Sequence, residues 1–201
     1  MSRPLIAILR GITPDEAVPV TAALLDAGFE RIEVPMNSPE PVESIRRIAY
    51  AHGDRGIFGA GTVLSVEEVE EVKQAGGTLI VSPNCDGQVI MATVAGGLES
   101  WPGVFTPTEA FAALGYGATG LKLFPGDMAG ANGLKAMKAV LPGDVPVYAV
   151  GGAGPENFGD WIAAGADGFG IGSALYKAGM GVDEISKNAE RIIAAYDKAA
   201  G

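Results

Sequence analysis

The stretch Gly120-Leu121-Lys122-Leu123-Phe124-Pro125 is the most informative one in the chain, both for the fold and for the chemistry. An apolar run that ends at a proline predicts a short buried strand, Leu121–Phe124. Lys122 stands inside this run, where a charge without a partner is costly to bury. Its ammonium could reach solvent from the strand end or pair with a carboxylate. Alternatively, burial could lower its pKa and leave a neutral amine, the nucleophile that forms a Schiff base with a carbonyl.

Strand-like and helix-like segments alternate on both sides of this stretch. The predicted strands are Leu5–Leu9, Arg31–Pro35, Ile57–Thr62, Leu79–Ser82, Glu99–Pro102, Leu121–Phe124, Val145–Val150 and Gly168–Ile171. The predicted helices, with their caps, are Thr13–Gly28, Ser38–Ala51, Ser65–Ala75, Asp86–Ala95, Thr106–Tyr116, Asn132–Leu141, Gly154–Gly165 and Val182–Ala199, with a short helical turn at Ser173–Lys177. This α/β alternation predicts a parallel sheet, and eight repeats favour a closed (β/α)8 TIM barrel over an open sheet. We expect one domain over residues 1–201.

Composition excludes several classes of function. The chain has 201 residues and a formal net charge of −10, which argues against nucleic-acid binding. An anionic substrate would have to be held by local positive features, such as helix N-termini or single arginines. The only cysteine, Cys85, allows no intrachain disulfide or Cys-based zinc site, and we interpret it as a loop residue. The only histidine, His52, lies at a predicted helix end, so we expect no metal site and no cofactor.

The sequence carries no sign of export or membrane insertion. Met1–Leu5 leads directly into the first predicted strand and does not resemble a signal peptide. No apolar stretch approaches the ~18 residues of a membrane span. We expect a cytoplasmic protein that binds neither nucleic acid nor membranes.

Polar residues and glycines gather where the predicted strands end, which is where TIM barrels carry their chemistry. They are Arg10, Glu33, Asn37, Thr62, Ser82, Asn84, Thr106, Lys122, Gly151-Gly152 and Gly172-Ser173. Glu33 lies in a strand that we expect to be buried on both faces. It could form an internal ion pair with Arg10, or act as general acid and base beside Lys122. Arg10 suits a substrate carboxylate or phosphate through a two-pronged hydrogen bond.

Two glycine clusters follow the seventh and eighth predicted strands. They are Val150-Gly151-Gly152-Ala153-Gly154 and Gly170-Ile171-Gly172-Ser173. A single pair of glycines is usually a turn. Two clusters at these strands, with a short extra helix after the second, form the barrel arrangement that binds phosphate through backbone N–H groups. We interpret Trp101 and Phe124 as packing residues.

The chain resembles a known family at five places. Ile8-Leu9-Arg10-Gly11, Ile32-Glu33-Val34-Pro35, Gly59-Ala60-Gly61-Thr62-Val63, Leu121-Lys122-Leu123-Phe124-Pro125 and Val150-Gly151-Gly152 are similar to stretches of the keto-hydroxyglutarate (KHG) and 2-dehydro-3-deoxy-phosphogluconate (KDPG) aldolases. Three features resemble the branch that acts on the 6-phosphogalactonate acid: Ile8–Glu16, Met36-Asn37-Ser38-Pro39, and Val150 before the glycine pair. Gluconate-type members usually carry Arg at the position of Asn37 and Thr at that of Val150. These departures favour the galactonate substrate and leave Arg10 and Thr62 to hold its carboxylate.

The resemblance implies a metal-free class I aldolase. Lys122 would form the Schiff base, and Glu33 would relay protons. Gly151, Gly152, Gly172 and Ser173 would hold the phosphate. The implied substrate is a phosphorylated 2-keto-3-deoxy sugar acid, the products are pyruvate and glyceraldehyde 3-phosphate, and the implied assembly is a homotrimer. The gluconate acid or 4-hydroxy-2-oxoglutarate could be cleaved by the same mechanism. A phosphosugar isomerase, epimerase or synthase would not need Lys122, and a non-catalytic phosphosugar binder would use Lys122 and Glu33 as an ion pair.

Overall fold

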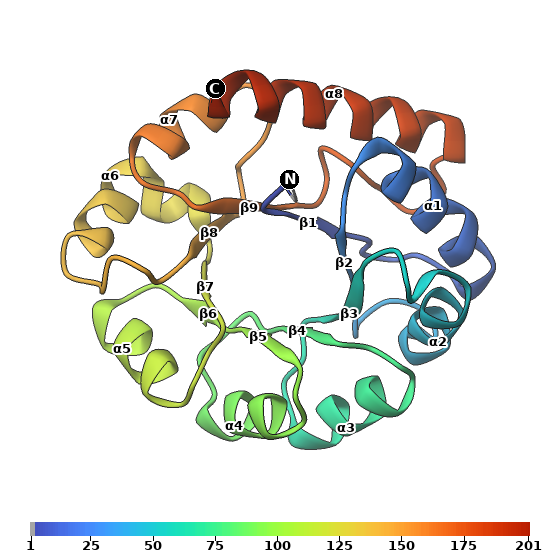
Figure 1. Cartoon of the computed structure of the whole chain (residues 1–201), viewed down its shortest axis with the longest axis horizontal. Helices are drawn as coiled ribbons and strands as arrows, with labels where there is room; N and C mark the ends of the chain where they lie inside the picture. The colour runs from blue at the N-terminus through green and yellow to red at the C-terminus, as the bar shows by residue number, and fades with distance from the viewer. Residues whose placement is uncertain (1–2) are drawn as a thin grey trace.

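Nine parallel strands form one sheet in the computed structural model, which describes residues 3–201. They are β1 (Leu5–Ile8), β2 (Arg31–Pro35), β3 (Ile57–Gly61), β4 (Leu79–Val81), β5 (Glu99–Trp101), β6 (Gly103–Val104), β7 (Leu121–Leu123), β8 (Val147–Val150) and β9 (Gly168–Ile171). Their order is β5-β4-β3-β2-β1-β9-β8-β7-β6. The two end strands, β5 and β6, are separated in sequence only by Pro102, so the sheet forms a ring (Figure 1). The predicted TIM barrel is confirmed.

The fifth predicted strand, Glu99–Pro102, is corrected by a break at Pro102. Proline has no backbone N–H to donate to a strand ladder, so the strand divides into β5 and β6. The Pro102 carbonyl still accepts the N–H of Lys122 at 2.9 Å. Because β5 pairs with β4 and β6 pairs with β7, the broken strand completes the ring.

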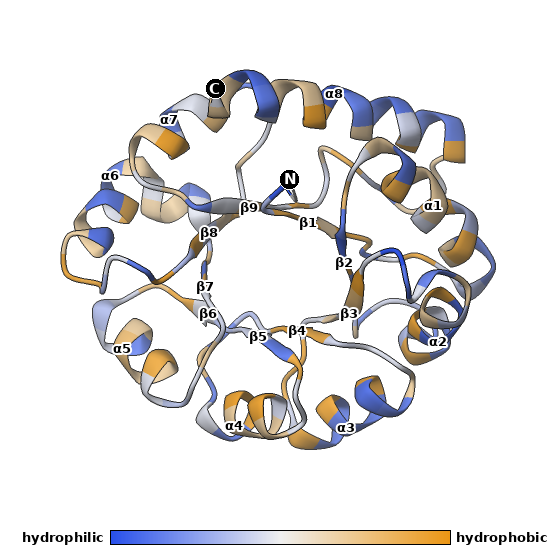
Figure 2. Ribbon diagram, viewed as in Figure 1, coloured by the Kyte–Doolittle hydropathy of each residue, from blue (hydrophilic) through white to orange (hydrophobic). Residues whose placement is uncertain are grey.

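Helices surround the ring on its outside (Figure 1). They are α1 (Pro14–Ala27), α2 (Pro41–His52), α3 (Val66–Gln74), α4 (Gly87–Ala95), α5 (Pro107–Gly115), α6 (Gly126–Lys138), α7 (Phe158–Ala163) and α8 (Val182–Ala200). The predicted start of α6 at Asn132 is too late, because helical structure already begins at Gly126 and continues through a kink at Gly130. The longest helix, α8, lies outside β9 and β1 and alternates between hydrophilic and hydrophobic residues (Figure 2).

Two helices begin later than predicted because side chains near the expected starts are bonded elsewhere. The hydroxyl of Ser38 accepts the N–H of Gly11 at 2.9 Å, and α2 starts only at Pro41. Asn157 accepts the N–H of Gly154 at 2.9 Å and donates to the carbonyl of Gly152 at 2.8 Å, which holds these residues in a turn before α7.

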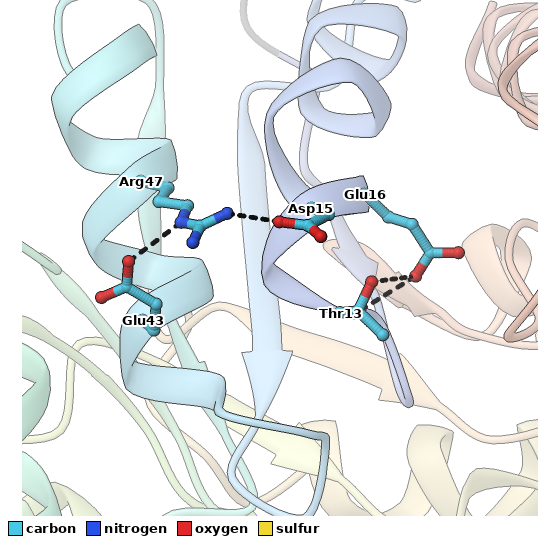
Figure 3. A network of polar contacts seen from close by, with 5 residues as sticks. All are labelled: Thr13, Asp15, Glu16, Glu43 and Arg47. Atoms are coloured by element: carbon cyan, nitrogen blue, oxygen red, sulfur yellow. Dashed lines mark hydrogen bonds and ion pairs between the residues drawn. The ribbon is translucent and has the colours of Figure 1, made fainter.

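Capping boxes form before two of the helices. Glu16 accepts the N–H of Thr13 at 3.0 Å before α1, and Glu109 accepts that of Thr106 at 2.8 Å before α5. Before α3, Glu68 instead accepts the N–H of Leu64. Figure 3 shows the α1 contact beside Arg47, which bonds Glu43 of its own helix and Asp15 of α1.

Alternation along the strands divides the apolar residues into two cores. Side chains such as Ile32, Val34, Leu121 and Leu123 pack in the layer between strands and helices. A second cluster consists of Ile6, Leu79, Val81, Trp101 and Tyr148. Residues that alternate with the outer layer point into the barrel, and these include Glu33 and Lys122.

A polar group closes the amino end of the barrel. Arg31, at the start of β2, makes two hydrogen bonds of 3.1 Å to the carboxylate of Glu99, at the start of β5. The indole N–H of Trp101 donates to the same carboxylate at 3.0 Å. The Trp101 and Tyr148 rings lie 4.3 Å apart between centroids. This group bridges strands that β3 and β4 separate in the sheet.

Candidate active site

A cavity of about 780 Å³ opens at the carboxyl end of the barrel. Nine predicted site residues line it: Arg10, Glu33, Thr62, Lys122, Val150, Gly151, Gly152, Gly172 and Ser173. The other candidates from the strand ends, Asn37, Ser82, Asn84 and Thr106, are not among its lining residues. The topology therefore gathers side chains from six strands around one space.

Lys122 has the environment expected of a reactive amine. It follows Leu121 and precedes Leu123, both of which face the helix layer, so its side chain points into the barrel. The residue is 7% exposed, and Nζ lies 4.6 Å from the centroid of the Phe124 ring. Burial lowers the pKa of Lys122; Arg10 acts in the same direction and the Glu33 carboxylate opposes both. The neutral amine is thus favoured more than in water.

Glu33 is a buried carboxyl with unused hydrogen-bonding capacity. It is 2% exposed, and within residues 3–201 its Oε2 atom has no hydrogen-bond partner. Burial raises the pKa of Glu33 to about 7, against the opposing effects of Lys122 and Arg10. Gly61 makes the space for this carboxyl group, because a Cβ atom at that position would overlap it. The pocket therefore holds a carboxyl group that can change protonation near neutral pH.

The predicted ion-pair alternatives are not found. Among the residues that the structure describes, no ion pair within 4.0 Å joins Glu33 to Arg10 or to Lys122. Arg10 instead donates from Nη1 to Oδ1 of Asn37 at 2.6 Å. Asn37 therefore orients Arg10 from outside the cavity, rather than lining it as predicted.

Thr62 has an unusual backbone conformation. Its φ is 57°, in the left-handed region that β-branched residues rarely adopt. Such strain persists only where the surrounding structure imposes it, commonly at functional sites. Thr62 comes directly after Gly61, the last residue of β3, and it lines the cavity.

Two glycine loops form one wall of the cavity. Gly151 and Gly152 have φ values of 98° and 75°, which favour glycine. After β9, the carbonyl of Gly172 accepts the N–H groups of Leu175 at 2.9 Å and Tyr176 at 3.0 Å. This single hydrogen-bonded turn lies where the sequence predicts a short helical turn, at Ser173–Lys177.

Several lining residues were not singled out from the sequence. They include Glu156, Asn157, Tyr176, Lys177 and Arg191. Lys177 and Arg191 stand in polar, helix-like stretches where such residues are routine. Only the position of Lys177 just after the last strand could have drawn attention to it.

Other candidate chemistry lies outside this cavity. The Cys85 thiol donates to the carbonyl of Glu109 at 3.4 Å, and burial raises its pKa, which disfavours the reactive thiolate. In residues 3–201, no three His, Cys, Asp or Glu side chains gather in a way that could hold a metal ion. Over the same residues, none of the helices has the length and apolar character needed to cross a membrane.

Comparison with known proteins gives consistent results. The family model for KDPG and KHG aldolase matches residues 1–193. A 2-dehydro-3-deoxy-6-phosphogalactonate aldolase of Escherichia coli (strain K12) is 50% identical over 196 residues, which are 98% of this chain and 96% of the relative. A solved structure described as native KDPGal has a TM-score of 0.98 and 48% identity, and the match covers 100% of this chain and 97% of that one. A cube-shaped protein cage designed by fusing symmetric oligomeric domains matches with a TM-score of 0.97 and 48% identity, over 100% of this chain and 74% of that one.

Proposed function

The chain belongs to the KDPG and KHG aldolase family, and we propose that it cleaves 2-dehydro-3-deoxy-6-phospho-D-galactonate to pyruvate and D-glyceraldehyde 3-phosphate. As a member of this family it is an aldolase, a carbon–carbon lyase. The galactonate substrate is supported by the half-identical Escherichia coli relative, whose match spans nearly both chains. Because the chain belongs to an aldolase family, we no longer consider the alternatives of a phosphosugar isomerase, epimerase or synthase and of a non-catalytic phosphosugar binder.

The observation that carries the mechanism is a buried lysine of lowered pKa that lines the same cavity as a buried carboxyl group. The neutral Lys122 amine attacks the C2 keto carbon, and loss of water leaves a protonated imine. The C3–C4 bond then breaks, and its electron pair moves towards the imine nitrogen to give an enamine. Protonation at C3 and hydrolysis release pyruvate and restore the amine.

Glu33 is the proton carrier in this proposal. Its carboxylate form takes the proton of the C4 hydroxyl as the C3–C4 bond breaks, which leaves the aldehyde. Its acid form supplies protons when the C2 oxygen departs as water. A pKa of about 7 keeps both forms accessible near neutral pH.

The remaining lining residues bind the two ends of the substrate. Arg10, held by Asn37, and Thr62 bind the carboxylate next to the keto carbon. The loops at Gly151-Gly152 and Gly172-Ser173 bind the phosphate through backbone N–H groups. Val150 offers no hydroxyl to the C4 region, in keeping with the galactonate configuration.

Borohydride trapping tests the mechanism. Pyruvate and borohydride should leave a reduced adduct on Lys122, located by peptide mass. The Lys122→Met variant should form no adduct and cleave at the background rate. Lys73→Met removes an exposed lysine from α3 and should behave like the wild type. No adduct, an adduct on another lysine, or cleavage by Lys122→Met at the wild-type rate would refute the Schiff-base proposal.

Competition between substrates tests specificity. The ratio of kcat/KM for the galactonate and gluconate acids should favour the galactonate form. A preference for the gluconate acid or for 4-hydroxy-2-oxoglutarate would replace the proposed substrate and leave the Lys122 mechanism in place.

A homotrimer in the cytoplasm completes the proposal. The matched cage was designed from symmetric oligomeric domains, which supports an oligomer. Exposed apolar side chains on α4 and around α5 support a contact between copies: Met91, Val94, Phe105, Phe111 and Tyr116 are each 42–49% exposed.

A further inference from the structure

The cavity lining has more basic than acidic side chains, whereas the whole molecule has fewer. Four basic side chains line the cavity, Arg10, Lys122, Lys177 and Arg191, against the carboxyl groups of Glu33 and Glu156. The whole chain has 14 basic and 24 acidic residues. Arg10 and Lys122 have roles in the proposed reaction, but Lys177 and Arg191 do not.

Lys177 and Arg191 reach the cavity from two elements that are bonded together. Lys177 follows the turn that begins at Gly172 after β9. Asn188 of α8 donates from Nδ2 to the carbonyl of Leu175 in that turn at 3.2 Å, which fixes the helix against the loop. Arg191 is three residues further along α8 and lies on the same side of the helix as Asn188. Both cations therefore flank the loop that carries Gly172 and Ser173.

These two side chains are free to meet an anion. Both are exposed, and within residues 3–201 neither takes part in an ion pair shorter than 4.0 Å. Six other cationic side chains do form such pairs: Arg3, Arg31, Arg46, Arg47, Arg55 and Lys138. What distinguishes these two side chains is their position, because both line the cavity beside the loop that carries Gly172 and Ser173.

We propose that Lys177 and Arg191 determine specificity for the phosphorylated substrate by binding its phosphate from the solvent side of the glycine loops. This inference rests on the proposed function. Backbone N–H groups supply short hydrogen bonds, whereas Lys177 and Arg191 supply the charge that distinguishes a dianionic phosphate from a neutral hydroxyl. The planar guanidinium of Arg191 can bind two phosphate oxygens at once. The pair also raises the local concentration of an anion around a protein of opposite net charge.

The test compares Lys177→Met, Arg191→Met and the double variant with Lys187→Met, which removes an exposed lysine of α8 outside the cavity lining. Three readouts are measured: kcat/KM for 2-dehydro-3-deoxy-6-phosphogalactonate, kcat/KM for its unphosphorylated analogue, and borohydride trapping of pyruvate. We expect each single variant to lower kcat/KM for the phosphorylated acid about threefold to tenfold. The double variant should lower it by about ten- to a hundredfold. The kcat/KM for the unphosphorylated analogue and the trapping of pyruvate should stay within about twofold of the wild type. Added salt should reduce the difference in kcat/KM between wild type and variants for the phosphorylated acid. Arg191→Lys should keep most of the preference.

The possible outcomes separate this inference from the proposed function. A double variant that prefers the phosphorylated acid as strongly as the wild type does would overturn the role of Lys177 and Arg191 alone. Equal losses in all three readouts would overturn it too, because they would indicate a disturbed site rather than lost phosphate recognition. A wild-type protein that traps no pyruvate would overturn the proposed function, and this inference with it.

Discussion

Glu33 couples the stability of the protein to its chemistry at the scale of one residue. The ordinary pKa of a glutamate is 4.5, and burial raises that of Glu33 to about 7. Between these pH values the folded protein keeps a proton that the unfolded chain releases. The stability contributed by this residue is therefore lost as pH rises through the window, by roughly 3 kcal/mol in all.

Replacing Glu33 by Gln should consequently stabilise the fold more at pH 8 than at pH 5. Gln keeps the shape of the side chain but carries no charge to bury. The lowered pKa of Lys122 acts in the opposite direction, but the lysine is present in both proteins. Urea denaturation of wild type and variant at the two pH values measures the difference. A stability gain that is the same at both would show that Glu33 does not titrate as inferred.

The same residue should shape the pH profile of the reaction. If Glu33 must be ionised to take the C4 hydroxyl proton, kcat/KM should rise with pH through about 7. Glu33→Gln should lower kcat/KM by about 10² to 10⁴ and lose that rise. A variant that keeps the rise would assign it to another group, with Lys122 the first candidate.

The close contact between Gly61 and the Glu33 carboxyl group gives a further prediction. Gly61→Ala would place a methyl group on the Glu33 carboxyl, so Glu33 must shift or the strands must part. We expect a loss of about 1–3 kcal/mol in unfolding free energy, together with a fall in kcat. Gly143→Ala is the control, because nothing lies within 4 Å of a Cβ at that position. Equal effects of the two substitutions would contradict the close contact.

At the scale of the element, the sequence predicts most of the barrel because apolar runs and capping residues are local signals. It misses features that depend on partners elsewhere in the chain. Pro102 lies within an apolar run, and its effect appears only where β4 and β7 pair on either side of the break. The helix starts at Ser38 and Gly154 fail because those groups bond to Gly11 and Asn157.

In the candidate site, too, the sequence predicts the residues that have local signals and misses those that depend on distant partners. Lys122, Glu33 and the glycine loops are predictable because each stands at a strand end in a barrel. Lys177 and Arg191 are not, because they converge only when α8 packs against the loop after β9. The Arg10–Asn37 contact is likewise a product of how the loops after β1 and β2 meet.

The polar group at the amino end of the barrel gives a prediction for β2 and β5. Arg31→Met would leave the Glu99 carboxylate with only the Trp101 indole as a donor in a setting that is 23% exposed. We expect a loss of about 1–3 kcal/mol in unfolding free energy, with kcat little changed, since the group lies away from the cavity lining. Arg3→Met breaks a more exposed pair with Asp197 and should cost less than about 1 kcal/mol. Chemical denaturation measures the unfolding free energy of both variants. An equal loss in the two would contradict the larger stabilisation that we assign to the Arg31–Glu99 contact.

At the scale of the whole molecule, one chain brings both groups of the proposed chemistry, Lys122 and Glu33, into the same cavity. What the single chain leaves unexplained is the apolar surface where α4 and α5 lie side by side. Val94 lies 3.6 Å from where a Cβ of Gly117 would be, and a Cβ at Gly87 would overlap the Tyr116 ring, so the two helices share one exposed face.

The proposed trimer should therefore dissociate when charge is placed on that face. In Val94→Glu combined with Phe111→Glu, two side chains that are 42% and 48% exposed in the single chain would carry charge into the interface between copies. Sedimentation should show a trimer for the wild type and a monomer for the variant. Met128→Glu, which changes a 74% exposed side chain on α6, should stay trimeric. Because Lys122 and Glu33 line the same cavity of one chain, the monomer should still trap pyruvate on Lys122. A wild type that sediments as a monomer would refute the trimer, and a variant that stays trimeric would move the interface to another face.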